Sequence, residues 1–422
     1  MAHDSSYEVV VVGGGSAGIA AAARLKVAGV NAVLLEAGDR LGGRAHTVTP
    51  GPDITVDLGC SWLHSARQNE WTRIAPTLGF TVDSSDAPWV RPALDLNFPL
   101  ADQKAYRKVF QAFEDRMEQA AEGADDVCAS DLIRPDERRW APLLNAFSGY
   151  YNGVSFDHIS VKDYAAYQPT DDNWRVREGY GALIAAFGAQ LNARLRTPVT
   201  SIRHDGPRVA IETDDGALEA RAVIVCVSTT VLAQEGLRFE PPLPAKREAA
   251  HALPLGHVEK AFIRLLTPED FPVEHRLYGR TDTADTASYG FRPLGMPVAE
   301  AFFGGDLAGR LAAEGPGALA AFAIDEMVAV FGSGLRARLA PAAESSWSVD
   351  PLIRGAYSHA RVGHAGAREA LAQPVDDRLF FAGEACSPHA FSTAHGAYET
   401  GVAAAEAAIA ALAAATSGKP GF

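Results

Sequence analysis

The chain has 422 residues, of which 47% are hydrophobic and 21% are charged, and its formal net charge is −14. It is longer than a single hydrophobic core usually becomes, so we expect two closely joined domains. The negative charge disfavours nucleic acid as a partner, because its phosphates would be repelled.

The spacing of the cysteines predicts a reducing compartment, and the spacing of the histidines disfavours a metal site. The four cysteines lie far apart without a C-x-x-C pair, which favours reduced thiols in the cytoplasm over a disulfide framework. The 12 histidines are scattered, without metal-ligand spacing. No signal peptide is evident, and no stretch approaches the ~20 apolar residues that span a bilayer. We therefore expect a cytoplasmic protein that binds neither a metal nor a membrane.

The first expected elements are a strand over 9–12, a glycine-rich turn, an alanine-rich helix and a strand over 31–35. Gly13, Gly15 and Gly18 form G-x-G-x-x-G, which permits a tight turn, close approach of a pyrophosphate and close helix–strand packing. Glu36 ends the second strand, where an acid accepts hydrogen bonds from ribose hydroxyls and disfavours the 2′-phosphate of NADP. A dinucleotide site is predicted; the alternative is a purely structural turn.

Further motifs follow along the chain. We expect a hairpin at 197–216, a buried strand within 220–232 and a strand that contains Lys260. The motifs are, in order, "GDRLGGRAHT" (38–47), "VDLGCSWLH" (56–64), "TPVTSIRHDGPRVAIETDDG" (197–216), "ARAVIVCVSTTVL" (220–232), "LPLGHVEKAFIRL" (253–265), "WSVDPLIRGAYSHA" (347–360) and "FFAGEACSPHAFSTAHGAYETG" (380–401).

In this order the motifs resemble those of the flavin-dependent amine oxidases, a family of monoamine oxidases, polyamine oxidases and lysine-specific histone demethylases. The resemblance extends over the whole chain and is nearest to the polyamine oxidases. It implies an α/β fold with a Rossmann-like FAD-binding domain and a mixed α+β substrate-binding domain. Some monoamine oxidases bind flavin through a cysteine before a tyrosine. Ala356 stands in that place, which implies non-covalent FAD.

The two domains are expected to be discontinuous in sequence. We assign 1–80, 196–245 and 346–422 to the FAD-binding domain. The helix-rich interval 81–195 and the strand-rich interval 246–345 do not resemble a nucleotide fold, and we assign them to the substrate domain.

The resemblance implies a set of cofactor-binding residues. Arg44 would lie near the pyrophosphate and flavin, and Glu384 would hold flavin-side hydroxyls. Small residues around Glu384 would let the helix that starts at Thr393 approach the ring, where its N–H groups stabilise negative charge. A small-residue packing seam is the alternative. The full set is Gly13, Gly15, Ala17, Gly18, Glu36, Gly43, Arg44, Ser61, Trp62, Val199, Trp347, Glu384, Thr393 and Ala394.

Three residues have catalytic roles by resemblance. Lys260 corresponds to a lysine that holds a water against flavin N5, although a lysine in an apolar strand is often only a snorkelling residue. Tyr357 corresponds to one wall of an aromatic cage for the amine, with core packing as the alternative. His64 corresponds to a histidine that faces an internal substrate nitrogen, with a histidine satisfied by the backbone as the alternative.

Two positions depart from the family pattern. Thr393 stands where monoamine oxidases have the second cage tyrosine. The absence of a tyrosine at this position resembles polyamine oxidases and histone demethylases instead. Gly38 stands where the family usually has arginine, which puts one adenine-side contact in doubt.

The activity implied is oxidation of a polyamine or related secondary amine. Hydride would pass to flavin N5, the imine would hydrolyse to an aldehyde and an amine, and O2 would be reduced to hydrogen peroxide. A monoamine oxidase, an amino-acid oxidase that binds its carboxylate through Arg292 or Arg354, a carotenoid-type desaturase and a non-catalytic flavin-binding interaction protein remain as alternatives.

Overall fold

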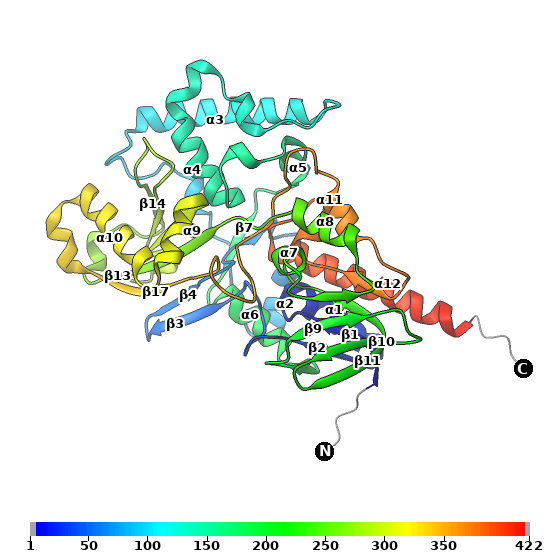
Figure 1. Cartoon of the computed structure of the whole chain (residues 1–422). Helices are drawn as coiled ribbons and strands as arrows, with labels where there is room; N and C mark the ends of the chain where they lie inside the picture. The colour runs from blue at the N-terminus through cyan, green and yellow to red at the C-terminus, as the bar shows by residue number, and fades with distance from the viewer. Residues whose placement is uncertain (1–5, 418–422) are drawn as a thin grey trace, which may run out of the picture.

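The computed structural model describes residues 6–417 and has two lobes, each built on its own sheet (Figure 1). The first sheet has the order β12-β9-β10-β11-β1-β2-β8, with β18 also paired to β11. Its strands are β1 (Ser6–Val12), β2 (Ala32–Leu35), β8 (Ala193–Arg194), β9 (Val199–Arg203), β10 (Val209–Thr213), β11 (Gly216–Val225), β12 (Arg238–Glu240) and β18 (Leu379–Phe381).

The centre of this sheet is parallel, because β1 lies between β2 and β11 and pairs with both in parallel register. Residues 9–12 are all buried, as expected for a central strand with both faces covered. Helices α1 (Ser16–Val27) and α12 (Ala394–Ser417) cover one face. Helices α7 (Thr229–Ala233), α8 (Pro244–Ala252) and α11 (Ala367–Ala372) cover the other.

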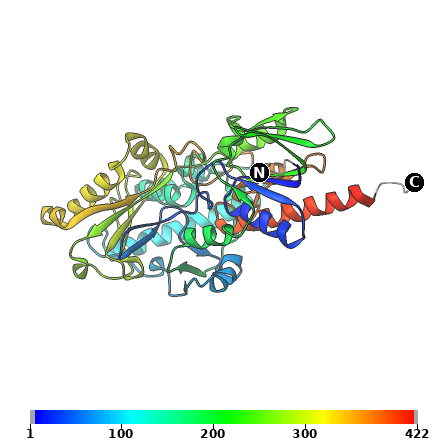
Figure 2. The same cartoon turned by 90° about the horizontal axis from the view of Figure 1, so that it is seen from below.

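The two ends of the chain meet in this lobe. Helix α12 runs beside α1, as Figure 2 shows. A Cβ added at Gly401 would lie 2.1 Å from the carbonyl oxygen of Ala17, so the two backbones approach each other too closely for a larger residue. The glycine and alanine content of both helices permits this contact.

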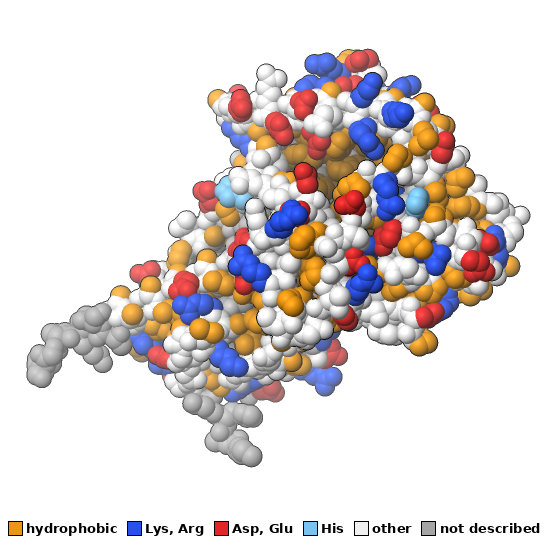
Figure 3. Space-filling model, turned by 180° about the vertical axis from the view of Figure 1, so that it is seen from behind, with side chains coloured by type: hydrophobic (Ala, Val, Ile, Leu, Met, Phe, Trp, Pro, Cys, Tyr) orange, Lys and Arg blue, Asp and Glu red, His pale blue; other side chains and the backbone are white. Residues whose placement is uncertain are grey.

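The second lobe contains an antiparallel sheet in the order β14-β15-β16-β13-β17. Its strands are β13 (Val258–Leu265), β14 (His275–Tyr278), β15 (Ser288–Phe291), β16 (Val298–Gly304) and β17 (Leu339–Glu344). Helices α9 (Gly305–Glu314) and α10 (Ala318–Phe331) share its core. Helices α3 (Leu100–Ala121), α4 (Ala141–Asn152) and α5 (Val161–Ala166) lie above it in Figure 1. From behind, the surface is hollowed below this upper part, and hydrophobic side chains lie in the hollow (Figure 3).

Shorter elements join the lobes. They are β3 (Thr47–Gly51), β4 (Ile54–Asp57), β5 (Leu63–His64), α2 (Glu70–Thr77), β6 (Val82–Asp83), β7 (Asn173–Val176) and α6 (Tyr180–Gly188). The Asp57 carboxylate accepts the backbone N–H groups of Tyr180 and Gly181, both at 3.0 Å, and so caps α6.

The predicted strands and the hairpin lie where the sequence places them. Strand β8 and helix α6 belong to the interval 81–195, yet β8 pairs with β2 and α6 packs into the core beneath α1. A division by packing would therefore place these elements with the first sheet. The domain boundaries remain a proposal.

Candidate active site

The glycine-rich turn after β1 leaves an open space at the start of α1. Gly13 has a φ of +105°, and a Cβ there would lie 2.7 Å from the Cys226 carbonyl oxygen. A Cβ on Gly18 would lie 1.9 Å from the Gly13 carbonyl oxygen. Gly15 differs, because its φ is −76° and a Cβ would have no atom of the described chain within 4 Å. Gly13 and Gly18 thus shape the turn, whereas Gly15 borders space available to a ligand.

Glu36 organises the loop beside this space. Its two carboxylate oxygens accept the backbone N–H groups of Gly14 and Gly38, each at 2.6 Å. A carboxylate has about four acceptor sites, so it retains capacity for hydroxyl groups. Gly43, with a φ of +56°, lies against Gly15: a Cβ there would be 3.1 Å from the Gly15 Cα. Both glycine motifs therefore border the same space.

Arg44 and Glu384 form a partly buried ion pair with an Nη1–Oε1 distance of 3.0 Å. Arg44 also donates to the Ala356 carbonyl oxygen. The Glu384 carboxylate accepts from Ser358 Oγ at 2.7 Å and from the Ser392 N–H at 3.0 Å. Burial alone would raise the pKa of Glu384, but the nearby Arg44 guanidinium and the hydrogen bonds hold it below its ordinary value. Glu384 is therefore ionised at neutral pH.

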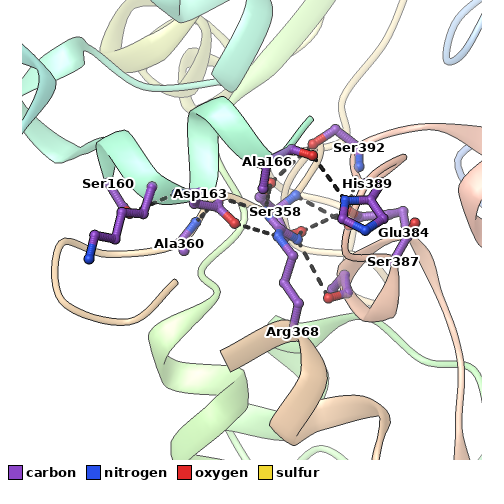
Figure 4. Close-up of polar contacts among 12 residues, drawn as sticks. Ser160, Asp163, Ala166, Ser358, Ala360, Arg368, Glu384, Ser387, His389 and Ser392 are labelled. Atoms are coloured by element: carbon purple, nitrogen blue, oxygen red, sulfur yellow. Dashed lines mark hydrogen bonds and ion pairs between the residues drawn. The ribbon is translucent and has the colours of Figure 1, made fainter. Parts of the chain in front are cut away.

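A second buried ion pair stands behind Glu384. Figure 4 shows Arg368 of α11 between Asp163 of α5 and Ser358. Arg368 Nε lies 2.6 Å from Asp163 Oδ1, and its Nη1 donates to Ser358 Oγ at 2.8 Å. Its guanidinium also lies 3.7 Å from the centroid of the Phe391 ring. The network fixes Ser358, which in turn donates to Glu384.

The segment 57–62 passes between the two lobes. Its Leu58 carbonyl oxygen accepts Trp347 Nε1 at 2.9 Å, and a Cβ on Gly59 would lie 1.7 Å from the Arg44 carbonyl oxygen. Glu259 has an exposed fraction of 0% and accepts from Ser345 Oγ and from the Trp347 N–H. The segment is thereby held against Arg44 on one side and Trp347 on the other.

Lys260 reaches this segment from the second sheet. Its Nζ lies 2.9 Å from Ser61 Oγ, 3.2 Å from the Asp57 carbonyl oxygen and 3.0 Å from Glu300 Oε1. The side chain is 5% exposed and lies over the Phe302 ring. Lys260 is thus a buried, paired cation rather than a snorkelling edge residue.

His64 is held as a neutral hydrogen-bond acceptor. Its Nδ1 lies 2.6 Å from Asn173 Oδ1, and because that amide oxygen only accepts, Nδ1 carries the proton. Burial lowers the pKa of His64, and the nearby Lys260 ammonium lowers it further. The hydrogen bond to Asn173 raises this pKa but does not outweigh the other two effects. Nε2 is then left as an acceptor. Burial lowers the pKa of the neighbouring His395 to about 4.

Other predicted residues have clear structural partners. Tyr357 donates its hydroxyl to the Tyr150 carbonyl oxygen. Thr393 caps α12, because its Oγ1 accepts the Gly396 N–H at 3.0 Å. Trp62 stacks edge-to-face on Trp89, with ring centroids 4.4 Å apart.

The remaining residues divide by location. Val199 begins β9 and is half-buried, and the Ala17 carbonyl group lies against Gly401. The structure brings together Arg44, Glu384, Trp347, Ser61 and Lys260. Their ligand-binding roles remain proposals.

These residues fit a dinucleotide with a flavin ring. The space at Gly15 faces the start of α1, whose first backbone N–H groups have no intrahelical acceptor. Glu36 offers acceptors for ribose hydroxyls, and Arg44 offers a cation. The start of α12 lies beside the start of α1, because Ser16 Oγ donates to the Ala394 carbonyl oxygen at 2.6 Å, and it presents the N–H groups of Ala394 and His395. The turn after β1 and the starts of both helices would therefore hold FAD.

Several residues of the site were not found from the sequence. Glu300, Asn173, Asp163 and Arg368 each pair with a residue far along the chain. An acid in an otherwise apolar strand, as in "VAEAFFGG", was the available signal for Glu300. Nothing in the local sequence distinguishes Asp163 or Arg368 from solvated helix charges.

Comparison with known proteins identifies the family. The model of flavin-containing amine oxidoreductases matches residues 16–137 and 90–409. Polyamine oxidase 3 of Oryza sativa subsp. japonica is 30% identical over 96% of this chain and 92% of its own length. Polyamine oxidase 2 of Arabidopsis thaliana is also 30% identical, over 95% of this chain and 88% of its own length.

Solved structures share the fold. A structure of putrescine oxidase bound to putrescine superposes with a TM-score of 0.77 at 19% identity, covering 96% of this chain and 99% of the other. This confirms the predicted α/β fold with an FAD-binding and a substrate-binding part. The glycine loop, the Arg44–Glu384 pair and the family match together lead to one conclusion: the chain belongs to the flavin-containing amine oxidoreductase family and is an amine-oxidising enzyme with FAD as its cofactor.

Proposed function

We propose that this enzyme oxidises polyamines or related secondary amines, with O2 as the electron acceptor and hydrogen peroxide as a product, in the cytoplasm. The observation that carries the proposal concerns the segment 57–62, which is held against Arg44 and Trp347. A neutral His64 follows this segment, and Lys260 contacts it at Ser61. Similarity to polyamine oxidases over nearly the whole chain supports the substrate class. So does the net charge of −14, which attracts polycations.

The chain's own residues orient the amine and control its protons. FAD, when bound, supplies the acceptor for the hydride of the amine α-carbon, which leaves an imine that water converts to an aldehyde and a smaller amine. His64 Nε2 would accept an N–H of the substrate, and the Tyr357 ring would form one wall. The N–H groups at the start of α12 would stabilise negative charge next to them.

Anaerobic reduction of the bound flavin tests the substrate class. The purified holoenzyme is mixed without O2 with a panel of polyamines, diamines, monoamines and amino acids, and flavin absorbance is followed. We expect polyamines to bleach the flavin fastest. Bleaching by amino acids alone would instead establish an amino-acid oxidase, and no bleaching by any compound would leave a flavin-binding interaction protein.

The arginines that an amino-acid oxidase would require have other partners. Arg292 donates to the Phe271 carbonyl oxygen, and Arg354 donates to the Pro351 carbonyl oxygen and the Gln234 side chain. Neither pairing involves the segment 57–62 or the Arg44–Glu384 pair. This arrangement favours an amine over an amino acid.

Replacement of Lys260 tests its role in the proposed reaction. We expect Lys260→Met to retain FAD, because the lysine makes no contact with the glycine loop, and to lower turnover at least tenfold. Stopped-flow measurement of flavin reduction and reoxidation would locate the slow step. Wild-type rates for both half-reactions would exclude the role.

The attachment of FAD is tested separately by acid precipitation of the holoenzyme. With Ala356 before Tyr357, we expect all the yellow colour in the supernatant. Colour that stays in the pellet would show a covalent bond.

A further inference from the structure

The Lys260 ammonium has no hydrogen left for a further partner. An ammonium group has three N–H donors and no acceptor. Three acceptors surround Nζ at hydrogen-bonding distance: Ser61 Oγ, the Asp57 carbonyl oxygen and Glu300 Oε1, at 2.9, 3.2 and 3.0 Å. A direct hydrogen bond from Lys260 to a water or ligand would require the loss of one of these contacts.

The same three acceptors separate Lys260 from the neighbouring cavity. A cavity of about 40 Å3 is lined by Asp57, Ser61, Trp62 and Glu300, among other residues, but not by Lys260. A volume of roughly 10–15 Å3 is enough for one water molecule, so this cavity has room for water. Whatever occupies it meets the acceptors and not the ammonium group.

Ser61 is the member of this group that retains a donor. Its Oγ accepts from Lys260, and a hydroxyl can accept and donate at the same time. Within residues 6–417, the Ser61 hydroxyl accepts from Lys260 but donates to no other group. Because Lys260 fixes the oxygen, the hydroxyl hydrogen is directed away from Nζ.

Glu300 cancels the charge that Lys260 would otherwise contribute. The two groups form an ion pair whose side chains are 5% and 21% exposed. Arg175 lines the same cavity, but it is itself paired with Glu274. Burial raises the pKa of Asp57 and raises the pKa of the Cys60 thiol to about 12. The pair is therefore close to neutral as a unit.

We propose that Ser61 and Glu300 are positioning residues of the active site: Lys260 acts through the Ser61 hydroxyl, and Glu300 neutralises its charge. This inference rests on the proposed function only in placing the cluster beside bound FAD. The Ser61 hydroxyl is then the donor offered to the flavin or to a water next to it. The ammonium group fixes that donor in place.

The midpoint potential of bound FAD tests the role of Glu300 without turnover. Dye equilibration would compare Glu300→Gln, Lys260→Met and their double variant with the wild type. We expect Glu300→Gln to raise the potential, because it leaves an uncompensated cation, and Lys260→Met to lower it. The double variant should return toward the wild-type value. Asp53→Asn removes the partner of Arg264 on the same strand and should change nothing, because that pair is exposed.

Reoxidation after photoreduction tests the role of Ser61. Light reduces the flavin without an amine, so this measurement remains valid even if the proposed substrate class is wrong. We expect Ser61→Ala to slow reoxidation by O2 as much as Lys260→Met, at least tenfold, and the double variant to be no slower. The potential of Ser61→Ala should shift less than that of Lys260→Met, because no charge is removed.

Two results would overturn the proposal. Wild-type reoxidation in Ser61→Ala would show that the ammonium group acts directly. An unchanged potential in Glu300→Gln, in a variant that binds FAD and has wild-type circular dichroism, would show that Glu300 does not set the charge of the site.

Discussion

Among single residues, Gly15 is one that the fold does not require to be glycine but that a bound ligand would. Its φ of −76° suits any residue, and a Cβ there would meet no atom within 4 Å in the described chain. We expect Gly15→Ala to leave the unfolding midpoint of the apoprotein unchanged and to weaken FAD at least tenfold in fluorescence titration. Gly18→Ala is the contrasting variant. Its Cβ would collide with the Gly13 carbonyl oxygen, and the apoprotein should be destabilised.

Glu384 contributes to the same site through charge. It is the carboxylate partner of Arg44 and accepts from Ser358 and Ser392. We expect Glu384→Gln to raise the dissociation constant of FAD by one to two orders of magnitude, roughly 1.5–3 kcal/mol, as for a charged hydrogen bond. Glu406→Gln is the matched control, because its pair with Arg24 is exposed and should leave FAD affinity unchanged. Equal affinities in both variants would contradict the assignment.

At the scale of elements, the Asp163–Arg368 pair joins α5, which lies above the second sheet in Figure 1, to α11, which covers the first sheet. The two residues are 205 positions apart, with side chains 5% and 2% exposed. We expect Arg368→Met to lower the free energy of unfolding by about 3–5 kcal/mol, because it leaves a buried carboxylate without a partner. Urea denaturation would measure this loss. An Asp163→Leu/Arg368→Met double variant should recover part of it, and a double variant less stable than the single one would argue against an uncompensated charge.

Elements formed by local sequence were predictable, whereas contacts between elements were not. A short segment predicts both a turn and the class of its ligand, a dinucleotide. The prediction comes from the spacing of Gly13, Gly15 and Gly18 and from the acid at Glu36. Lys260 was found because a lysine interrupts an apolar strand in a motif that resembles the family. Its partner Glu300 depends on how β13 and β16 pair, and Asn173 meets His64 across 109 residues. Such contacts are set by tertiary packing, which no local pattern encodes.

For the molecule as a whole, buried histidines predict sensitivity to acid. Burial lowers the pKa of both His359 and His395 to about 4, from an ordinary value of 6.5. As the pH falls below 6.5, the unfolded chain binds protons at these sites and the folded chain does not, so stability is lost progressively toward pH 4. The loss is on the order of 3 kcal/mol for each histidine.

Urea unfolding at intervals between pH 7 and about 5 measures this effect in a Glu114→Gln background, because burial raises the pKa of the Glu114 carboxyl to about 7 and would make it titrate in the same range. We expect His359→Gln and His395→Gln each to flatten the dependence of unfolding free energy on pH. A slope that stays the same in both variants would assign the acid sensitivity to other groups.

The crossing of α1 and α12 has a consequence for biosynthesis. The loop proposed to receive the pyrophosphate is translated well before α12, which packs on α1 and is proposed to face the ring. A nascent chain that has not yet reached α12 therefore holds only part of the proposed FAD site, and the vitamin-derived cofactor would be captured once α12 has been made. Supply of riboflavin during expression should then govern how much newly made protein matures, rather than how fast it is translated.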